Sequence, residues 1–389
     1  MGTQHDSMKS PVYLDNAAST PMDKEVLDAM MPYFGDFFGN PSSTHSFGRK
    51  CKSAVENSRR TIAGYLNATP GEIVFTSGGT EADNLALRAS VEDLGVTHII
   101  TSAIEHSAVI KTAGILARQR GIRLSLVNLS SDGNVSLEHL EELLKSEEKT
   151  LVSLMHGNNE IGNLLSLLEV GKLCRKYNAL FHSDTVQTMG HYSFDLRTLP
   201  IDFVTCAAHK LHGPKGIGFL FVNRDLRVNA IISGGGQERQ VRGGTENVPA
   251  IVGMAKAFEL AYNNLDAHRE HVLGLKMQMA EQLEKDLPGV DFNGDSRSPD
   301  SLYTVLSITL PPSINAGMML FLLDLEGIAC SGGSACSSGA AKGSHVLEAL
   351  GAIKPGRASL RFSFSRYNLK SDINRAVEAL CSICKISAE

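Results

Sequence analysis

The sequence predicts an α/β fold in which a mostly parallel, seven-stranded sheet forms a large domain, accompanied by a smaller α+β domain. Three observations predict it. Seven β-rich apolar runs lie between residues 72 and 223, and amphipathic segments of helical length separate most of them. The 389 residues suffice for roughly two to three domains with sizeable cores. Strands that alternate with helices in this way form a largely parallel sheet covered on both faces.

The alternation defines the elements of the large domain in order. Strands are predicted over residues 72–77, 97–102, 123–129, 150–156, 179–184, 201–208 and 218–223. Helices are predicted over residues 81–91, 107–118, 137–144 and 165–177. A turn-rich, slightly basic loop over residues 233–247 follows the last strand, and helical sequence then runs from residue 248 to about residue 287.

The remaining sequence predicts the smaller domain. Its expected elements are strands over 304–310 and 358–365, a helix over 318–327, a Gly/Ser-rich loop over 331–339 and a terminal helix from residue 371. The helical stretch after residue 248 contains the boundary, near residues 260–265. We therefore assign residues 21–262 to the large domain, and residues 1–20 and 263–389 to the small domain.

Composition narrows the class of partner. The chain has 37 Lys and Arg against 42 Asp and Glu, a net charge of −5 without blocks of like charge, which disfavours nucleic acid and membrane surfaces. The longest apolar stretch is far too short to cross a bilayer. Neither a signal peptide nor a transit peptide is recognisable in the first ten residues, and seven cysteines do not suit a disulfide framework. We expect a cytoplasmic protein with free thiols and a small-molecule partner.

Two strand ends suggest a site for an anion, because open α/β sheets bind ligands beyond the carboxyl ends of their strands. The segment SGGT, which includes Gly79 and Thr80, ends one strand and opens a helix. Small residues there let backbone N–H groups and a hydroxyl surround a phosphate, although an ordinary βα turn has the same composition. His106 ends a second strand, where a lone histidine is more often a capping or packing residue.

Two further strand ends carry an acid and a lysine. Asp184 ends one strand, and Gln187 follows three residues later, within reach of the same ligand. An aspartate at such a position is more commonly an N-cap. His209 and Lys210 follow the next strand, where desolvation lowers the pKa of a lysine ammonium toward nucleophilic use. Most lysines in such turns are merely solvated.

Together these residues match the requirements of one cofactor. Pyridoxal 5′-phosphate needs a Schiff-base lysine, a carboxylate at its pyridine nitrogen, a ring to stack on and a phosphate cup. One more residue stands apart, because Cys336 lies in SGGSACSSG, a segment too small and polar to bury a thiol. We expect this thiol to be exposed, mobile and reactive.

Ten motifs in order along the chain then make a resemblance specific. They are YLDNAAST, FGNPSSTH, IVFTSGGTEADNLA, EHSAV, MHGNNEIG, HSDTVQ, HKLHGPKGIG, GGGQERQVRGGTEN, GSACSSG and LRFSFSRY. From Tyr13 to the terminal helix, the chain resembles cysteine desulfurases of the NifS/IscS type, which are class V aminotransferase-like enzymes. The resemblance implies the fold-type I architecture of transferases that depend on pyridoxal 5′-phosphate.

The resemblance also implies the reacting residues. Lys210 would hold pyridoxal 5′-phosphate as a Schiff base and later move protons, and Asp184 would pair with the pyridinium nitrogen. His106 would stack on the ring and act in acid/base steps, while Gln187 would reach the side of the ring hydroxyl. Cys336 matches the family's nucleophile.

Binding roles are implied for the other candidates. The expected phosphate ligands are Gly79, Thr80 and His209. Asn159 matches a residue that binds cofactor and substrate, and Arg361 would clamp the substrate carboxylate with its bidentate fork. Thr245 matches a residue that reaches the phosphate of the neighbouring subunit, which requires a homodimer.

One position departs from the family pattern. Ser or Thr commonly lies three residues before the Schiff-base lysine and donates to the phosphate, but this chain has Ala207 there. The phosphate cup then lacks one hydroxyl donor, worth about 0.5 to 1.5 kcal/mol. We expect weaker cofactor retention, or a water in place of the hydroxyl, rather than loss of function.

The implied reaction converts L-cysteine to L-alanine and leaves sulfur on Cys336 as a persulfide. An acceptor protein would then take the sulfur for iron–sulfur cluster assembly or tRNA thiolation. A selenocysteine lyase would need less from Cys336, and an ordinary class V aminotransferase would not need it. A sulfur carrier or scaffold-binding protein with a vestigial site is disfavoured, because Lys210, Asp184, His106 and Arg361 are all present.

Metal binding has little support in the sequence. Cys381 and Cys384 form a single C-x-x-C on a predicted helix, without the second pair that a structural zinc site needs. We expect no metal and assign that pair a structural or accidental role.

Overall fold

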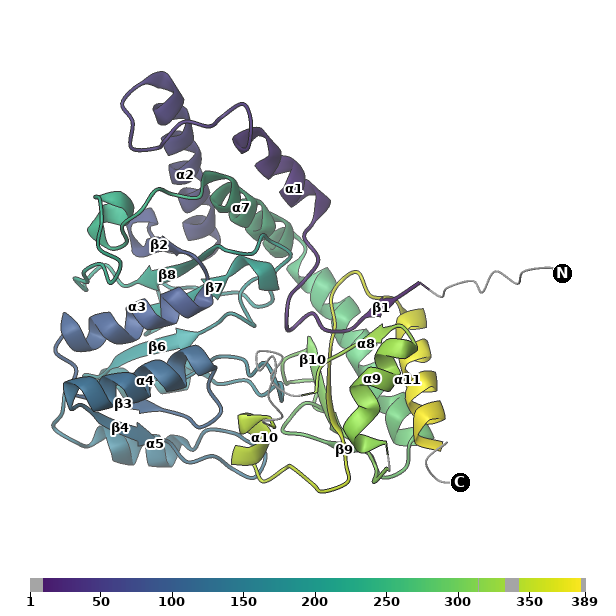
Figure 1. The fold of residues 1–389 in the computed structure, drawn as a ribbon. Coiled ribbons are helices and arrows are strands. Elements are labelled where there is room, and N and C mark those ends of the chain that lie inside the picture. Colours follow the sequence, from purple (N-terminus) through teal and green to yellow (C-terminus); the bar gives the residue numbers. More distant parts are fainter. Residues whose placement is uncertain (1–9, 314, 333–342, 386–389) are drawn as a thin grey trace. The chain divides into compact units, whose positions relative to one another are not determined.

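The computed structural model describes residues 10–313, 315–332 and 343–385, which divide into two compact units (Figure 1). The larger unit comprises Ser19–Asn158 and Asn163–His268. The described residues of the smaller unit are 10–18, 159–162, 269–313, 315–332 and 343–385. The short piece around Asn159 is thus grouped with sequence more than a hundred residues away.

A seven-stranded sheet forms the centre of the larger unit, which confirms the predicted α/β class. The strand order is β2-β8-β7-β6-β5-β3-β4, with β8 antiparallel to both neighbours and all other pairs parallel. The strands are β2 (Ile73–Thr76), β3 (His98–Thr101), β4 (Arg123–Leu126), β5 (Thr150–Ser153), β6 (Leu180–Asp184), β7 (Phe203–Ala207) and β8 (Gly218–Val222). All seven lie within the apolar runs that predict them.

Helices cover both faces of this sheet, because alternate strand residues point to opposite sides. Ile73 and Phe75 belong to a core shared with α2, α5, α6 and α7, whereas Val74 belongs to a core shared with α3 and α4. Figure 1 shows α3 beside α4, and α2 beside α7. The helices of this unit are α1 (Lys24–Met30), α2 (Ser46–Tyr65), α3 (Gly79–Glu92), α4 (Ser107–Arg120), α5 (Leu137–Leu144), α6 (Leu167–Lys176) and α7 (Val248–Asn263).

Helix α2 is absent from the sequence-based prediction, although it has 20 residues. Its buried face contains Arg59, which is 2% exposed. The Arg59 guanidinium donates to Glu238, with Nη1–Oε2 at 2.7 Å and Nη2–Oε1 at 2.8 Å, and this pairing permits its burial. A buried arginine counts as polar in a periodicity pattern, so the apolar stripe of α2 is obscured in the sequence.

The same ion pair shapes the loop over residues 233–247. Glu238 also accepts a hydrogen bond from the backbone N–H of Phe75 at 2.8 Å. Glu238, Arg239 and Gln240 all have left-handed backbone angles, with φ of 45°, 55° and 69°. Three successive non-glycine residues rarely adopt this conformation. The buried contacts of Glu238 therefore hold a strained segment in place.

The helical sequence after residue 248 forms two helices rather than one. Helix α7 ends at Asn263, and α8 (Leu265–Asp286) begins two residues later. Asn264 between them has φ −127°, and its side-chain amide donates to the Leu260 carbonyl at 3.3 Å. This side-chain bond competes with the helical backbone bonds and accounts for the break.

The smaller unit is built from short strands and helices. Its strands form an antiparallel sheet of order β12-β10-β9 and a parallel pair β1-β11. They are β1 (Val12–Tyr13), β9 (Asp291–Phe292), β10 (Val305–Thr309), β11 (Ile328–Ala329) and β12 (Ser359–Ser363). The helices are α8, α9 (Met319–Leu325), α10 (His345–Ala349) and α11 (Lys370–Lys385). Across the described parts of both units, no helix is both long enough and apolar enough to cross a membrane.

Candidate active site

The candidate residues of the larger unit gather at one edge of its sheet. Thr76, the last residue of β2, and Ala207, the last of β7, both pair with Gly218 at the start of β8. The SGGT segment and the segment that carries Lys210 therefore leave the sheet on either side of Gly218. A Cβ at Gly218 would lie 2.3 Å from the Cys206 carbonyl oxygen and 2.9 Å from Gly78 Cα, so only glycine permits this approach.

The SGGT segment has the shape of an anion cradle. Helix α3 begins at Gly79, so its unpaired N-terminal N–H groups and the positive end of its dipole lie in this segment. A Cβ at Gly79 would lie 2.9 Å from Val186 Cγ2, which requires glycine here as well. Thr80 is exposed in the first turn of α3. A phosphate group suits these donors.

Asp184 is buried where β6 ends. Its side chain is 6% exposed, and one carboxylate oxygen accepts a hydrogen bond from the Val186 N–H at 2.9 Å. Burial, together with the neighbouring Asp83 carboxylate, raises the pKa of Asp184 to about 6, whereas His106 acts in the opposite direction. A cation placed beside this carboxyl group therefore stabilises its ionised form.

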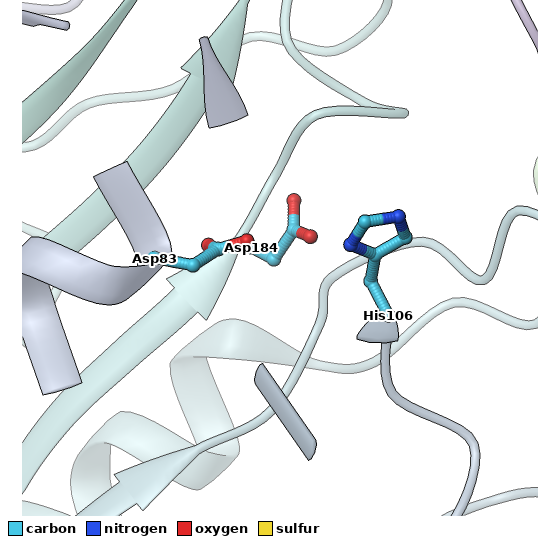
Figure 2. Close-up of side chains that lie close together, drawn as sticks. All are labelled: Asp83, His106 and Asp184. Carbon is cyan, nitrogen blue, oxygen red and sulfur yellow. The ribbon is translucent and has the colours of Figure 1, made fainter. Parts of the chain in front are cut away.

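Asp184 is part of a cluster of charged and titratable side chains. One ligand atom from each of Asp83, His106 and Asp184 lies within 4.8 Å of the others. Figure 2 shows the Asp83 and Asp184 carboxyl groups together and the His106 ring on the far side of Asp184. Burial also raises the pKa of Glu105 to about 8, with a further contribution from Asp184. Such a group attracts a cation, either a metal ion or a protonated heterocyclic nitrogen.

Sequence reasoning missed Asp83 and Glu105. Asp83 lies on α3 with buried apolar residues one, three and four positions away: Ala82, Ala86 and Leu87. An acid inside an apolar stripe is the signal that identifies such a residue. Glu105 directly precedes His106, and nothing in the sequence distinguishes it from a solvated glutamate.

His106 is both an N-cap and a member of this cluster. It precedes α4, and its Nδ1 accepts a hydrogen bond from the Ala108 N–H at 3.2 Å. The capping role that is common for a lone histidine is thus observed. The cap also fixes the orientation of the ring beside Asp184.

Lys210 and His209 lie in the 3₁₀ turn Ala208–Lys210 that follows β7. Because β7 is parallel to β6 and adjacent to it, Lys210 and Asp184 emerge at the same sheet edge. Burial lowers the pKa of His209 to about 4, with further lowering by Lys210 and Lys215, so its imidazole is neutral at pH 7. Its Nδ1 lies 3.3 Å from Ser19 Oγ. Gln187 is also buried at this edge.

Ala207 faces the anion cradle. Its Cβ would lie 3.8 Å from a Cβ built on Gly79, and its side chain is 2% exposed. A hydroxyl on this side chain would therefore point toward the SGGT segment. The departure from the family pattern thus falls beside the SGGT segment.

Two other candidates, Asn159 and Arg361, belong to the smaller unit. Arg361 on β12 is 2% exposed. Its Nη1 donates to the Asn159 carbonyl at 2.9 Å, and its Nη2 donates to Asp15 Oδ1 at 2.9 Å. Asp15 also accepts from Ser331 Oγ at 2.8 Å. The Arg361 Nε–H has no hydrogen-bond partner among the described residues, so this guanidinium retains a donor for a carboxylate.

Thr245 lies apart from the acidic cluster, exposed in the loop over residues 233–247. It lines a cavity of about 220 Å³ together with Ser77 and Arg242. Arg242 is fixed there by an ion pair with Glu81, with Nε–Oε1 at 2.9 Å. Cys336 lies outside the described residues.

Comparison with known proteins identifies relatives over nearly the whole chain. Residues 12–376 match the family described as Aminotransferase class-V. The cysteine desulfurase IscS of Dictyoglomus turgidum is 39% identical over 378 residues, which cover 96% of this chain and 94% of that protein. A cysteine desulfurase of Sinorhizobium fredii is 38% identical over 380 residues, which cover 96% of this chain and 97% of the relative.

Solved structures agree with these sequence relatives. A NifS-like protein from Rickettsia africae has a TM-score of 0.86 and 34% identity, covering 96% of this chain and 99% of its own. SspA in complex with cysteine has a TM-score of 0.78 and 31% identity, covering 92% of this chain and 100% of its own.

The chain belongs to the aminotransferase class-V family. Within that family, its place is among the cysteine desulfurases of the IscS and NifS type. This placement confirms the resemblance found in the sequence motifs and the fold type that the resemblance implies.

Proposed function

We propose that this enzyme uses pyridoxal 5′-phosphate to convert L-cysteine to L-alanine and keeps the sulfur on Cys336 as a persulfide. One observation carries the proposal: the buried Asp184 carboxyl, with a pKa of about 6, lies beside the His106 ring at the sheet edge that Lys210 shares. This is the arrangement that a protonated pyridine ring with an aldehyde requires.

The residues of the larger unit fit the cofactor. The cradle at Gly79, which a Cβ would obstruct, suits the phosphate, with Thr80 and His209 as additional ligands. Asp184 suits the ring nitrogen, Gln187 the hydroxyl side of the ring and His106 the ring face. Bound there, pyridoxal 5′-phosphate supplies an electron sink that stabilises negative charge at the substrate Cα.

The protein's own groups would carry the protons and hold the substrate. Lys210 Nζ takes the proton from the substrate Cα and returns it later, and Asp184 keeps the ring nitrogen protonated. Arg361 binds the substrate carboxylate through its remaining N–H groups, and Asn159 assists. That a related solved protein, SspA, is in complex with cysteine supports L-cysteine as the substrate.

The sulfur transfer balances without an added oxidant. The Cys336 thiolate attacks the substrate sulfur, the substrate C–S bond breaks, and L-cysteine with one enzyme thiol becomes L-alanine with one enzyme persulfide. Two of the described cysteines, Cys174 and Cys330, are poor nucleophiles, because burial raises the pKa of their thiols to about 12.

The decisive experiment measures alanine formation, bound sulfur and cofactor absorbance on three variants. Cys336→Ala should abolish alanine formation from cysteine while the yellow absorbance of the bound cofactor remains. Lys210→Ala should lose that absorbance band. Cys384→Ala, which removes a half-buried thiol of α11, serves as the matched control and should behave like the wild type.

Mass spectrometry supplies the second readout. After incubation with cysteine, the wild type should gain about 32 Da on Cys336, the mass of one sulfur atom in the covalent intermediate. Unchanged alanine formation by Cys336→Ala would overturn the role of this thiol. Faster turnover of selenocysteine than of cysteine by that variant would point to a selenocysteine lyase.

We further propose a homodimer in which Thr245 reaches the phosphate of the neighbouring subunit. Exposed apolar side chains concentrate around α1 and the start of α2, including Met31, Phe34, Phe38 and Phe47 at 54–72% exposure. Patches of this kind mark protein interfaces. Thr245 is itself exposed, as a residue that acts across an interface must be in the isolated chain.

Subunit mixing tests this proposal. Thr245→Ala and Lys210→Ala should each be impaired alone, yet a mixed dimer contains one site with both an intact Lys210 and an intact Thr245. Alanine formation that recovers on mixing supports a contribution across the interface. If the mixture is only as active as the sum of the two separate variants, Thr245 acts in the site of its own subunit.

The sulfur acceptor is proposed to be a protein of iron–sulfur cluster assembly or tRNA thiolation in the cytoplasm. The six described cysteines are all free thiols, which suits a reducing compartment. Transfer of labelled sulfur from the persulfidated enzyme to candidate acceptors would distinguish the two destinations.

A further inference from the structure

Asp83 is a buried acid to which the reaction described above gives no role. It lies in the second turn of α3, and its side chain is 1% exposed. Neither of its carboxylate oxygens has a hydrogen-bond partner within residues 10–313, 315–332 and 343–385. Burial of a carboxylate without partners is expensive, so such a residue requires an explanation beyond packing.

Ordinary structural roles do not account for Asp83. It is not the N-cap of α3, which is Gly78, and no backbone N–H of the residues that the structure describes donates to it. No arginine or lysine in the described part of the chain forms an ion pair with it. The nearest basic group is the imidazole of His182 on β6, whose Nε2 lies 3.5 Å from Asp83 Oδ1.

His182 is itself engaged on both sides. Its Nδ1 lies 2.8 Å from Ser153 Oγ, and its Nε2 lies 3.1 Å from Thr205 Oγ1. Both hydroxyls can donate or accept, so they hold the ring in place without neutralising the charge of Asp83. His182 and Asp184 are two residues apart on β6 and therefore point to the same face of the sheet.

The Asp83 carboxylate is directed at Asp184. Figure 2 shows the Asp83 carboxyl group pointing toward Asp184, whose own carboxyl group points to the side of the His106 ring, and one oxygen of each acid lies within 4.8 Å of the other. Two acids at this separation repel, which is reflected in the contribution of Asp83 to the raised pKa of Asp184. A single positive charge placed at Asp184 interacts favourably with both carboxylates and relieves this repulsion.

We propose that Asp83 is a positioning residue for the cofactor: a second carboxylate, behind Asp184, that favours the protonated form of the pyridine ring. This inference rests on the proposed function, because it assumes that pyridoxal 5′-phosphate binds at Asp184. It assigns Asp83 an electrostatic role at the ring nitrogen and no contact with the substrate.

The test compares two ligands that differ at one ring atom. Wild-type enzyme is freed of cofactor and titrated with pyridoxal 5′-phosphate, and separately with the carbocyclic analogue in which C–H replaces the ring nitrogen. Asp83→Asn should weaken binding of pyridoxal 5′-phosphate about tenfold, which corresponds to about one pKa unit of the ring nitrogen. Binding of the analogue should remain unchanged, since its ring carries no proton.

The cofactor-free protein gives an independent readout. Because Asp83→Asn removes a buried charge without a partner, the thermal midpoint of this form should stay the same or rise. Asp83→Ser provides a second neutral variant with a smaller side chain, in case the amide is not accommodated. Asp202→Asn is the matched control: Asp202 is buried in the same unit but bound by Arg175 at 2.9 Å. It should lower the thermal midpoint and leave cofactor affinity unchanged.

The outcomes separate this inference from the proposed function. The inference is supported if both Asp83 variants bind pyridoxal 5′-phosphate more weakly than the wild type but bind the carbocyclic analogue equally well. Unchanged affinity overturns it, and so does equal weakening of both ligands, which would indicate a purely structural role. If the wild type binds neither ligand, the proposed function itself fails.

Discussion

Asp184 in the larger unit and Arg361 in the smaller unit are buried to a similar degree, at 6% and 2% exposure, but among the described residues only Arg361 forms an ion pair within 4 Å, with Asp15 at 2.9 Å. Arg361 donates to Asp15, whereas Asp184 faces a second acid, Asp83. A buried charge that is already paired contributes to the folded state. A buried acid with a like charge beside it is further stabilised in its ionised form when a ligand supplies a counter-charge.

The difference indicates which charge depends on a ligand. Around Asp184, burial and a like charge raise the pKa of the acid to about 6, so the site is most favourable when a cation is bound. Around Arg361, Asp15 and the Asn159 carbonyl already orient the guanidinium. Substitution of Asp184 should therefore affect alanine formation, whereas substitution of Arg361 should affect the KM for cysteine and the folding stability.

The largest effect is expected for Asp184→Asn. Without a carboxylate at the ring nitrogen, alanine formation should fall by about 100- to 1,000-fold, the range for loss of a preorganised electrostatic group. The folding stability of the cofactor-free protein should change little, because relief of the repulsion from Asp83 offsets the weakened hydrogen bond from the Val186 N–H. Steady-state kinetics and thermal denaturation of this form measure the two quantities, and a large loss of stability would contradict the comparison.

Arg361→Gln should show the opposite pattern. The KM for cysteine should rise about 10- to 100-fold, since a charge-assisted hydrogen bond contributes about 1.5–3 kcal/mol. Folding stability should also fall, by about 1–3 kcal/mol, because Asp15 loses its cation. Urea unfolding checks the second effect. Asp15→Asn is the control, and it should lower stability with a smaller change in KM.

Lys276→Met sharpens the comparison, because Lys276 is a buried amine of the smaller unit that forms no ion pair with a carboxylate of the described residues. It is 0% exposed, and its Nζ donates to Ser301 Oγ at 2.6 Å and to the Leu302 carbonyl at 3.2 Å. Burial lowers its pKa to about 7, below the unfolded value near 10.5.

Between these two pKa values the unfolded chain binds more protons, so wild-type stability should rise with pH from about 7 to about 10.5. Unfolding by urea at pH 7, 8 and 9 should show this rise in the wild type and a flatter dependence in Lys276→Met. Parallel pH dependences in the two proteins would show that Lys276 remains charged in the fold.

Ala207→Ser should have the smallest effect. A hydroxyl that faces the anion cradle adds one donor to the phosphate, so cofactor affinity should increase about 2- to 10-fold. Titration of the cofactor-free protein measures this change. Equal affinity in both proteins would mean that another donor already occupies the position.

The alternation of apolar runs and amphipathic segments was sufficient to predict the sheet and the residues at its strand ends. Asp184 ends a predicted strand, and Lys210 and His106 each follow one. Parallel strands bring their carboxyl ends to one edge, so the proximity of these residues follows from the fold class. Asp83 could not be found in this way. Its approach to Asp184 depends on how α3 packs against the sheet, which strand alternation does not determine.

Charges buried by distant partners were also hidden from the sequence. Arg59 made α2 look polar, because its partner Glu238 lies 179 residues further along the chain. The break at Asn264 was likewise not predicted, because a single side-chain hydrogen bond divides a stretch whose composition is helical throughout. Cys336 is recognisable from its motif alone, and its role rests on the chemistry proposed above.

The Arg59–Glu238 pair has a consequence for the order of folding. Closing a contact across 179 residues carries a large entropic penalty, so the left-handed segment at residues 238–240 has no support until α2 and the sheet have come together. The loop that carries Thr245 should therefore acquire its shape late, after the central sheet. The strands that position Asp184 and Lys210 would therefore be in place before this loop takes its final shape.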